Sequence, residues 1–456
     1  MNQKSLSRDL TKGSPWKKIL LFALPLLGSS LIQQLYSTVD LIFVGRFIGK
    51  EASAAVGSSD LLVTLLVGLF TGISVGSSVI AGQAFGSGDK NRLHQLIQSV
   101  VAFGAIGSLV LIGLGEIFAP ALLRLMNTPE EVFSMAVVYL RIYFLCLFSL
   151  VLYNLGSGIV RAIGDSMAAM RFQIFGAITN VVADFVFIYV FAWGIAGAAI
   201  ATFASQTLAA LLTLRYLMKL EPGVALTLKE RTIDRKVIGK VLSIGIPAGL
   251  QSMIMTLSNI LVQTVINGFG VDTVSAFVVY FKVELFIWYP LVALGQALVT
   301  FTAQNVGAGQ DKRVGKGLAI TLVMGTVVSV AISSVLLIFG HSVFWLFNTD
   351  PVVIENCSII AGITMPLYFL YQIQEDFSSV MKGRGNGLTP MLINIICICG
   401  LRLVLLYSFT AKWHTIRAIA AIYPLTWGAA GLVMVIAFLL QERRRIKRIK
   451  KEGNAD

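Results

Sequence analysis

The chain has 456 residues, of which 56% are hydrophobic and only 13% are charged, and its mean hydropathy is +0.81. Soluble globular domains carry about 25% charged residues, so this composition excludes an ordinary soluble domain and indicates a membrane protein. The net charge of +13 would suit a nucleic-acid binder, but the basic residues collect in short loops between apolar runs. Cytoplasmic loops of membrane proteins show this pattern, and we expect no nucleic-acid partner.

Runs of about 20 apolar residues are long enough to cross a bilayer as helices. Twelve such runs follow one another along the chain and predict an all-α membrane protein with twelve transmembrane helices. They cover residues 18–43, 55–80, 95–118, 134–157, 167–192, 195–218, 238–266, 278–302, 317–340, 357–381, 388–409 and 417–440. The first run lacks the short apolar core and small-residue cleavage site of a signal peptide, so we expect it to be a retained span.

The distribution of basic residues predicts the orientation of these spans. Twelve spans place both termini on one side, and most of the 36 lysines and arginines lie on that side, the last of them in the tail RRRIKRIKK (443–451). Because such an excess marks the cytoplasmic side, we expect a multi-pass protein of the cell (inner, cytoplasmic) membrane with both termini in the cytoplasm. The basic tail either contacts anionic lipid or is a solvated helix end.

The two halves of the chain repeat each other. The loop after span 2 reads GQAFGSGDKNR, and the loop after span 8 reads AQNVGAGQDKR. Corresponding positions differ by 221 or 222 residues over four spans: Gln83 and Gln304, Gly86 and Gly307, Gly88 and Gly309, Gly164 and Gly385, Pro25 and Pro247. Since each half holds an even number of spans, the sequence predicts two parallel repeats related by an axis along the membrane normal.

This repeat predicts a division into lobes. We expect an N-terminal six-helix lobe over 1–220, a cytoplasmic linker over 221–237, a C-terminal six-helix lobe over 238–441 and a basic cytoplasmic tail over 442–456. Prolines in or near span interiors each remove a backbone hydrogen bond and permit a bend. They are Pro25, Pro247, Pro290 and Pro366.

Cysteine and histidine form no reactive cluster in the sequence. The four cysteines lie in or beside apolar runs, where structural thiols are expected, and the three histidines are scattered at span ends. No His, Asp and Glu group or Ser–His pair falls at one membrane depth. We therefore expect neither an enzyme nor a cofactor.

Polar residues in the first half converge at one membrane depth. From a helical rise of about 1.5 Å per residue, Asp184 in span 5 and Thr202 in span 6 both lie roughly 12–14 Å below the outer turn at Trp193. Asp40 lies roughly 9 Å from its end of span 1. Asn180 precedes Asp184 by four residues and shares its helix face.

These four side chains predict a cation-coupling site. Carboxylate, amide and hydroxyl oxygens are hard ligands that suit a small cation such as Na⁺, and two neighbouring carboxylates can instead share a proton. A carboxylate within the bilayer costs several kcal/mol unless it is paired, hydrated or protonated, and such residues mark ion or proton paths. The alternative is that these groups only tie helices together, as Asn and Thr often do.

The second half carries its polar groups elsewhere. Glu284 lies near the outer end of span 8, Glu375 and Asp376 lie within span 10, and Arg402 lies in the middle of span 11. A structural ion pair between Arg402 and a span-10 acid is the expected contact; a cation-attracting role for the acids is the alternative. The candidates for a substrate path lined by aromatic and acidic side chains are Tyr36, Glu284, Tyr371, Glu375 and Asp376.

Several segments together resemble the multidrug and toxic compound extrusion (MATE) family over nearly the whole chain. They are STVDLIFVGR, GQAFGSGD, RAIGD, TNVVADFVFIY, IPAGLQ, AQNVGAGQ and MKGRGN. The resemblance implies a prokaryotic member, DinF-like or NorM-like, with two six-helix bundles forming a V. It implies a multidrug efflux antiporter that exports organic cations and other amphipathic drugs in exchange for H⁺ or Na⁺. The family's first-lobe cation site matches Asp40, Asn180, Asp184 and Thr202.

One stretch departs from the family pattern. Some members carry an acid in span 7 that helps bind sodium, but MIMTLSN (253–259) has none, which favours coupling in the first lobe. We expect drugs, dyes, H⁺ or Na⁺ and membrane lipids as partners, and a monomer. The alternative function is a flippase for a lipid-linked precursor. It would need a basic cavity, and Arg402 is nearly alone among the apolar spans.

Overall fold

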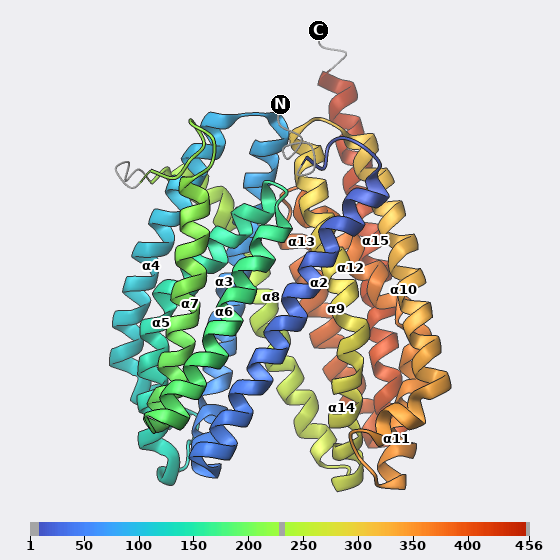
Figure 1. Ribbon diagram of the computed structural model, residues 1–456. Helices are drawn as coiled ribbons and strands as arrows, with labels where there is room; N and C mark the ends of the chain where they lie inside the picture. Colours follow the sequence, from blue (N-terminus) through green and yellow to red (C-terminus); the bar gives the residue numbers. More distant parts are fainter. Residues whose placement is uncertain (1–8, 228–232, 453–456) are drawn as a thin grey trace. The chain divides into compact units, whose positions relative to one another are not determined.

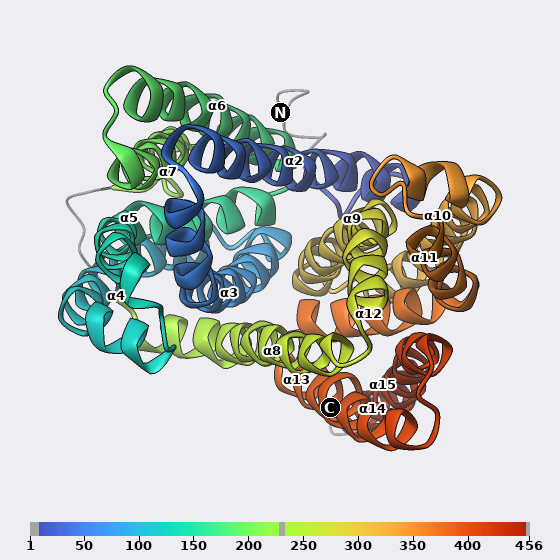
Figure 2. The same cartoon turned by 90° about the horizontal axis from the view of Figure 1, so that it is seen from below.

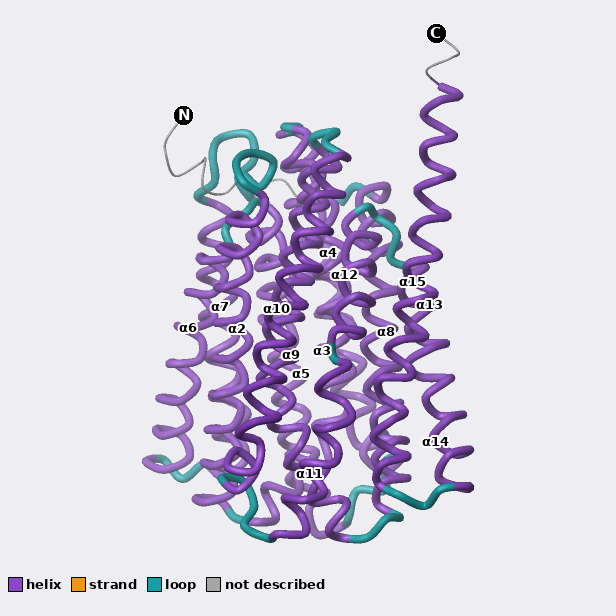
Figure 3. Tube along the Cα trace, turned by 90° about the vertical axis from the view of Figure 1, so that its right-hand side faces the viewer, coloured by secondary structure: helices purple, strands orange, loops and turns teal. Residues whose placement is uncertain are grey.

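The computed structural model describes residues 9–227 and 233–452, and every regular element in these ranges is a helix (Figure 1). Figure 3 shows the same result as a continuous run of helices joined by short loops. In chain order the elements are α2 (Pro15–Phe43), η1 (Val44–Ile48), α3 (Lys50–Ser87), α4 (Lys90–Leu125), α5 (Glu130–Ala162), α6 (Ser166–Asp184), η2 (Phe185–Val190), α7 (Gly194–Met218), α8 (Arg235–Asn267), α9 (Val271–Gly307), α10 (Asp311–Trp345), α11 (Pro351–Thr364), η3 (Met365–Leu367), α12 (Phe369–Gly383), α13 (Leu388–Asn394), η4 (Ile395–Gly400), α14 (Leu401–Lys412) and α15 (Ile416–Glu452).

These helices confirm the predicted spans. Eleven are long and apolar enough to cross a membrane, and a twelfth span is formed by α11 and α12, which are bent by 47° relative to each other. The bend falls at Pro366, one of the four prolines expected to permit one, inside the short 3₁₀ segment η3. The four cysteines are free and buried, as expected for structural thiols.

Three spans contain a π-helical turn that the sequence did not indicate. The turns η1 and η2 end spans 1 and 5, and η4 interrupts span 11 between α13 and α14. A π turn inserts one extra residue into a helix, re-aims the side chains around it, and is frequent at functional sites. Asp184 is the last residue before η2, and Asp40 lies four residues before η1.

The described helices fall into two compact units. Among the described residues, the first unit comprises 9–13, 21–227, 233–249 and 303–310, and the second comprises 14–20, 250–302 and 311–452. The predicted lobe boundaries remain a prediction. In the first unit, α5 is the central helix, with α3, α4 and α7 around it (Figure 2). Its buried side chains, among them Tyr139, Tyr143 and Phe144, form the core of that unit.

Repeat-related turns share one backbone conformation. Gly88 follows α3 and has a φ of 72°, and Gly309 follows α9 and has a φ of 68°. Gly164 and Gly385 have φ of 92° and 93°. These values lie in the left-handed region, which glycine enters without steric cost. The duplicated glycines therefore serve the same turn in each half.

The end of α3 crosses the repeat-related end of α9 within the first unit. A Cβ atom on Gly86 would lie 1.9 Å from the carbonyl oxygen of Gln304, and one on Gly307 would lie 2.1 Å from the carbonyl oxygen of Gln83. The contact is therefore reciprocal between duplicated residues, and only glycine permits it.

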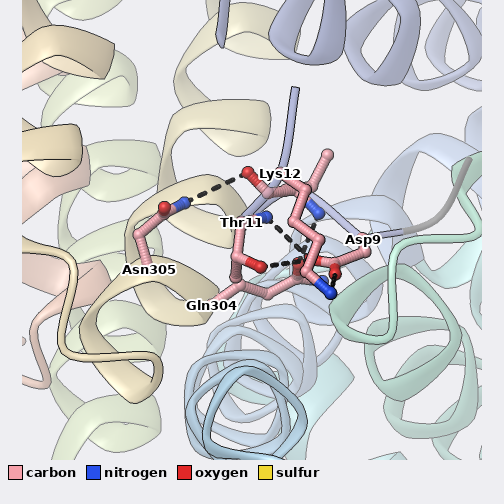
Figure 4. Close-up of polar contacts among 6 residues, drawn as sticks. Asp9, Thr11, Lys12, Gln304 and Asn305 are labelled. Carbon is pink, nitrogen blue, oxygen red and sulfur yellow. Dashed lines mark hydrogen bonds and ion pairs between the residues drawn. The ribbon is translucent and has the colours of Figure 1, made fainter. Parts of the chain in front are cut away.

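Gln304 also ties this crossing to two other segments. Its Nε2 donates to the Ala162 carbonyl at the end of α5 (2.7 Å), and its Oε1 accepts from the backbone N–H of Leu10 (2.9 Å). Asn305 Nδ2 donates to the Leu10 carbonyl (3.4 Å), and Asp9 accepts two hydrogen bonds from Thr11 (Figure 4). The segment before α2 is thus held against the end of α9.

Helices α3 and α8 approach each other through glycine in the same unit. A Cβ atom on Gly72 would lie 2.1 Å from the backbone nitrogen of Gly249, and one on Gly76 would lie 2.2 Å from the carbonyl oxygen of Val241. Small residues permit such close packing of membrane helices.

The second unit has its own core of apolar and aromatic side chains from α8 to α15. Tyr280, Tyr368 and Trp427 are almost fully buried in it. The hydroxyl groups of Tyr280 and Thr364 are hydrogen bonded (2.7 Å), and Ser333 donates to the Met365 carbonyl (2.8 Å) beside the bend between α11 and α12.

Candidate functional site

The predicted coupling residues of the first unit come from three helices. Asp40 lies on α2, Asn180 and Asp184 lie on α6, and Thr202 lies on α7. Asn180 is 1% exposed and Asp184 is fully buried, whereas Asp40 is half-buried. Two carboxylates from different spans are thus placed in the interior or at its edge.

The structure brings Asp40 and Asp184 together. Their carboxyl groups are close enough to interact electrostatically with each other. Both oxygens of Asp184, Oδ1 of Asp40 and both polar atoms of the Asn180 amide are buried and have no hydrogen-bond partner among the described residues. Two ionised carboxylates in such contact repel each other and lose their hydration. The pair is therefore destabilised when both of its members are ionised.

Thr202 lies in α7. Its hydroxyl donates to the Ala198 carbonyl of the same helix (3.2 Å), so its oxygen lone pairs remain able to accept or to coordinate. Gly197, one turn before, sits so close to η2 that a Cβ atom there would lie 3.0 Å from the Phe187 carbonyl oxygen. This approach holds α7 against the π turn that follows Asp184.

Two further residues belong to the surroundings of this pair. The buried Tyr139 hydroxyl on α5 lies within electrostatic range of Asp40, Asp184 and Asp60. Asp60 lies on the exposed surface of α3, inside the predicted span 55–80, and sequence reasoning passed over it. The signal that could have identified Asp60 is its position as a carboxylate within an apolar run.

The donor set fits a hard cation or a proton. The four predicted residues offer carboxylate, amide and hydroxyl oxygens, and of these the Asp40 and Asp184 carboxylates interact with each other. In the described ranges, no group of three or more His, Cys, Asp or Glu residues could hold a metal ion, so nothing there matches a transition-metal site. Two carboxylates with neutral oxygen donors suit Na⁺ or a shared proton.

The substrate-path candidates separate in the structure. Glu284 and Tyr371 line a cavity of about 410 Å³ within the second unit, whereas Glu375 and Asp376 are not among its lining residues. Asp376 is fully buried and accepts from Gln372 Nε2 (2.8 Å).

Two of the substrate-path candidates, Glu375 and Tyr36, lie outside this cavity. Glu375 packs beside Gly295 of α9. Tyr36, on α2 in the first unit, is half-buried and lies within electrostatic range of Asp40.

The expected ion pair of Arg402 with a span-10 acid is wrong. Among the residues that the structure describes, no ion pair includes Arg402. Its Nη2 donates to Thr426 Oγ1 (3.2 Å), and its guanidinium carbon lies 4.6 Å from the ring centre of Tyr423. Of the acids of α12, Asp376 accepts from Gln372 and Glu375 packs beside Gly295. Arg402 lines the cavity with Glu284.

An all-helical chain with up to twelve candidate membrane spans in two repeats is typical of a membrane transport protein. The family model of MatE matches residues 25–186 and again residues 247–408, so both halves of the chain match the same model and the duplication is confirmed. The chain belongs to the MatE family of transporters.

Curated relatives and solved structures agree with this assignment. The chain is 28% identical to the "probable multidrug resistance protein YoeA" of Bacillus subtilis (strain 168), over 97% of this chain and 98% of the relative. It is 24% identical to the "multidrug export protein MepA" of Staphylococcus aureus (strain NCTC 8325 / PS 47), over 84% and 85%. A crystal structure of "MATE in the bent conformation" matches with a TM-score of 0.88 and 23% identity, over 98% and 99% of the two chains, which shows the fold.

Proposed function

We propose that this protein is a multidrug efflux antiporter of the cell membrane, which exports amphipathic drugs, organic cations among them, in exchange for H⁺ or Na⁺. Family membership supports transport, and the names of the relatives from B. subtilis and S. aureus support multidrug resistance and export. The excess of basic residues on one side supports cytoplasmic termini.

One observation supports the coupling role: Asp40 and Asp184 interact electrostatically in the first unit, and their buried oxygens have no hydrogen-bond partner among the described residues. Such a pair repels when both members are ionised and is neutralised when a proton or Na⁺ enters. Cation occupancy therefore changes the free energy of holding α2 against α6.

The mechanism couples that change to alternating access. In the outward-facing state the pair takes up H⁺ or Na⁺, α2 repacks against α6 and α7, and the drug leaves to the outside. The cation-loaded carrier then turns inward and releases its cation. The membrane potential supplies about 2.3 kcal/mol per charge per 100 mV. Asn180 and Thr202 would add neutral oxygen ligands if the cation is Na⁺.

The test is dye efflux from inverted vesicles that contain the purified protein, driven in turn by an imposed Na⁺ gradient and an imposed pH gradient. We expect one of the two gradients to drive transport, and Asp40→Asn to abolish it at normal expression, because an amide cannot change its charge. Asp89→Asn is the matched control: it removes a carboxylate from the same unit but keeps a side chain that caps α4. Normal gradient-driven efflux by Asp40→Asn would refute the coupling role.

A further inference from the structure

The first unit contains a polar cavity of about 430 Å³, lined by residues of α3, α4 and α8 and of the turns before α4 and α8. That volume can hold a small ligand or the headgroup of a lipid. Seven of the nine lining residues are polar or charged. Neither Asp40 nor Asp184 is among them, so the coupling mechanism does not use this cavity.

The cavity lies at the ends of two spans, on the side that the basic residues assign to the cytoplasm. Apart from Ile80, its lining residues fall within 89–95 and 234–240, and the apolar runs of spans 3 and 7 begin at 95 and 238. Lipid headgroups occupy this level, between the hydrocarbon core and water. The cavity is therefore within reach of the headgroups of that leaflet.

Three basic side chains line the cavity without an ion pair. Arg92 on α4 and Lys236 and Lys240 on α8 take part in no ion pair within the part of the chain that the structure describes. Lys236 and Lys240 are four residues apart on one helix, a spacing at which like charges repel each other. An anion bound between them would remove that repulsion.

The two acids of the cavity already serve the starts of the helices. The Asp89 carboxylate accepts from the backbone N–H of Arg92 at the start of α4 (2.9 Å). The Asp234 carboxylate accepts from the backbone N–H groups of Lys236 (2.7 Å) and Val237 (3.3 Å) at the start of α8. Three cations and these two capping carboxylates leave the cavity with a net positive charge, which suits an anionic ligand.

Hydrogen bonds fix the two helix starts relative to each other. The backbone N–H of Asp234 donates to Ser99 Oγ of α4 (3.0 Å), and Gln98 Nε2 of α4 donates to Thr227 Oγ1 in the segment before α8 (2.8 Å). Helix α3 also packs closely against α8 at Gly76. The basic residues of α4 and α8 are thus held around one cavity before a ligand arrives, which lowers the cost of ordering them.

We propose that this cavity binds the phosphate of an anionic phospholipid from the cytoplasmic leaflet, through Arg92, Lys236 and Lys240. That leaflet is rich in anionic lipid, and basic pockets at the cytoplasmic ends of membrane helices bind such headgroups. A bound headgroup bridges α4 and α8 and strengthens the contact between them. The proposal goes beyond the export function and does not depend on it.

Three probes distinguish the possible ligands. Dioleoyl phosphatidylglycerol is anionic, dioleoyl phosphatidylcholine has the same acyl chains without net charge, and glycerol 3-phosphate is a water-soluble anion. Binding to the purified protein in detergent is measured by native mass spectrometry, which counts the lipids bound. Each basic residue near an anionic headgroup changes the affinity by roughly five-fold, so the first phosphatidylglycerol should bind at least about ten-fold more tightly than phosphatidylcholine.

Variants then locate the site. Lys236→Gln combined with Lys240→Gln should weaken phosphatidylglycerol by roughly ten-fold or more and leave phosphatidylcholine unchanged. Lys236→Arg combined with Lys240→Arg keeps both charges and should bind as the wild-type protein does. Arg171→Gln combined with Arg215→Gln is the matched control, because it removes two exposed arginines of the same unit that do not line the cavity. That control should change the affinity for neither lipid.

Equal affinities of the two lipids for the wild-type protein would overturn the proposal, and this comparison needs no variant to fold. Equal losses in the lysine-to-glutamine and arginine-to-glutamine variants would overturn it as well, because the effect would then follow the net charge and not the cavity. Displacement of phosphatidylglycerol by an equal concentration of glycerol 3-phosphate would refute the lipid assignment and identify a site for soluble phosphates. Phosphatidylglycerol should also raise the melting temperature of the wild-type protein, and an unchanged value would contradict the bridge between α4 and α8.

Discussion

The reciprocal crossing of α3 and α9 makes a quantitative prediction about two glycines. In Gly307→Ala the new Cβ atom would lie 2.1 Å from the Gln83 carbonyl oxygen, and in Gly86→Ala it would lie 1.9 Å from that of Gln304. Cβ atoms essentially never approach closer than 3.0 Å, so in each variant the backbone must move by about 1 Å. Overpacking of this kind typically costs about 1–3 kcal/mol.

Because duplicated residues make the two contacts, we expect the two substitutions to destabilise the protein by similar amounts. In the double variant the loss should be smaller than the sum, since one separation of the helices relieves both clashes. The assay is thermal unfolding of purified protein, followed by tryptophan fluorescence, together with size-exclusion chromatography to confirm a single folded species. A destabilisation of about 1–3 kcal/mol lowers the melting temperature by several degrees.

Gly315→Ala in α10 is the matched control. A Cβ atom there would meet nothing within 4 Å, and alanine favours a helix over glycine by about 1 kcal/mol. That variant should be as stable as the wild-type protein or slightly more stable. Wild-type melting temperatures for both Gly86→Ala and Gly307→Ala would refute the reasoning, because the reciprocal contact would then not exist in the folded protein.

Three further predictions concern other parts of the chain. Asp184→Asn should abolish cation-dependent drug release in the vesicle assay at normal expression; wild-type release would make Asp184 only a helix contact. Gln304→Leu should remove the Oε1 acceptor of the Leu10 N–H and the Nε2 donor to the Ala162 carbonyl, at about 1 kcal/mol for each lost hydrogen bond, and limited proteolysis before α2 should become faster; unchanged proteolysis would contradict this. Pro366→Ala restores a backbone donor at the 47° bend. Spin labels at the two ends far from the bend, the start of α11 and the end of α12, should therefore move apart; an unchanged distance would show that packing, and not proline, makes the bend.

The membrane topology could be predicted from the sequence because the bilayer imposes it. A span must be apolar over about 20 residues and must satisfy its backbone within one helix, so hydropathy alone located all twelve spans, including the one bent at Pro366. The duplication was also visible, since Gly88 and Gly309 serve the same turn in the two halves and Gly86 and Gly307 make reciprocal contacts.

The candidate coupling site was predictable only in part. Counting residues along a helix gives the depth of Asp40 and Asp184, because the rise per residue is constant. Whether two side chains at one depth meet depends on the rotation of each helix about its axis. The π turn η2 directly after Asp184 changes that rotation, and tertiary packing decides where such a turn forms.

Arg402 shows most clearly what only the tertiary structure decided. In the sequence, the acids of span 10 are the expected opposite charges for Arg402. In the structure, Asp376 accepts a hydrogen bond from Gln372, and Arg402 donates to Thr426 and contacts the Tyr423 ring. The sequence determined that a charge lies in the membrane, because composition shows it. Its partners depend on which faces of α12, α14 and α15 pack together, and that choice placed Arg402 in a cavity with Glu284.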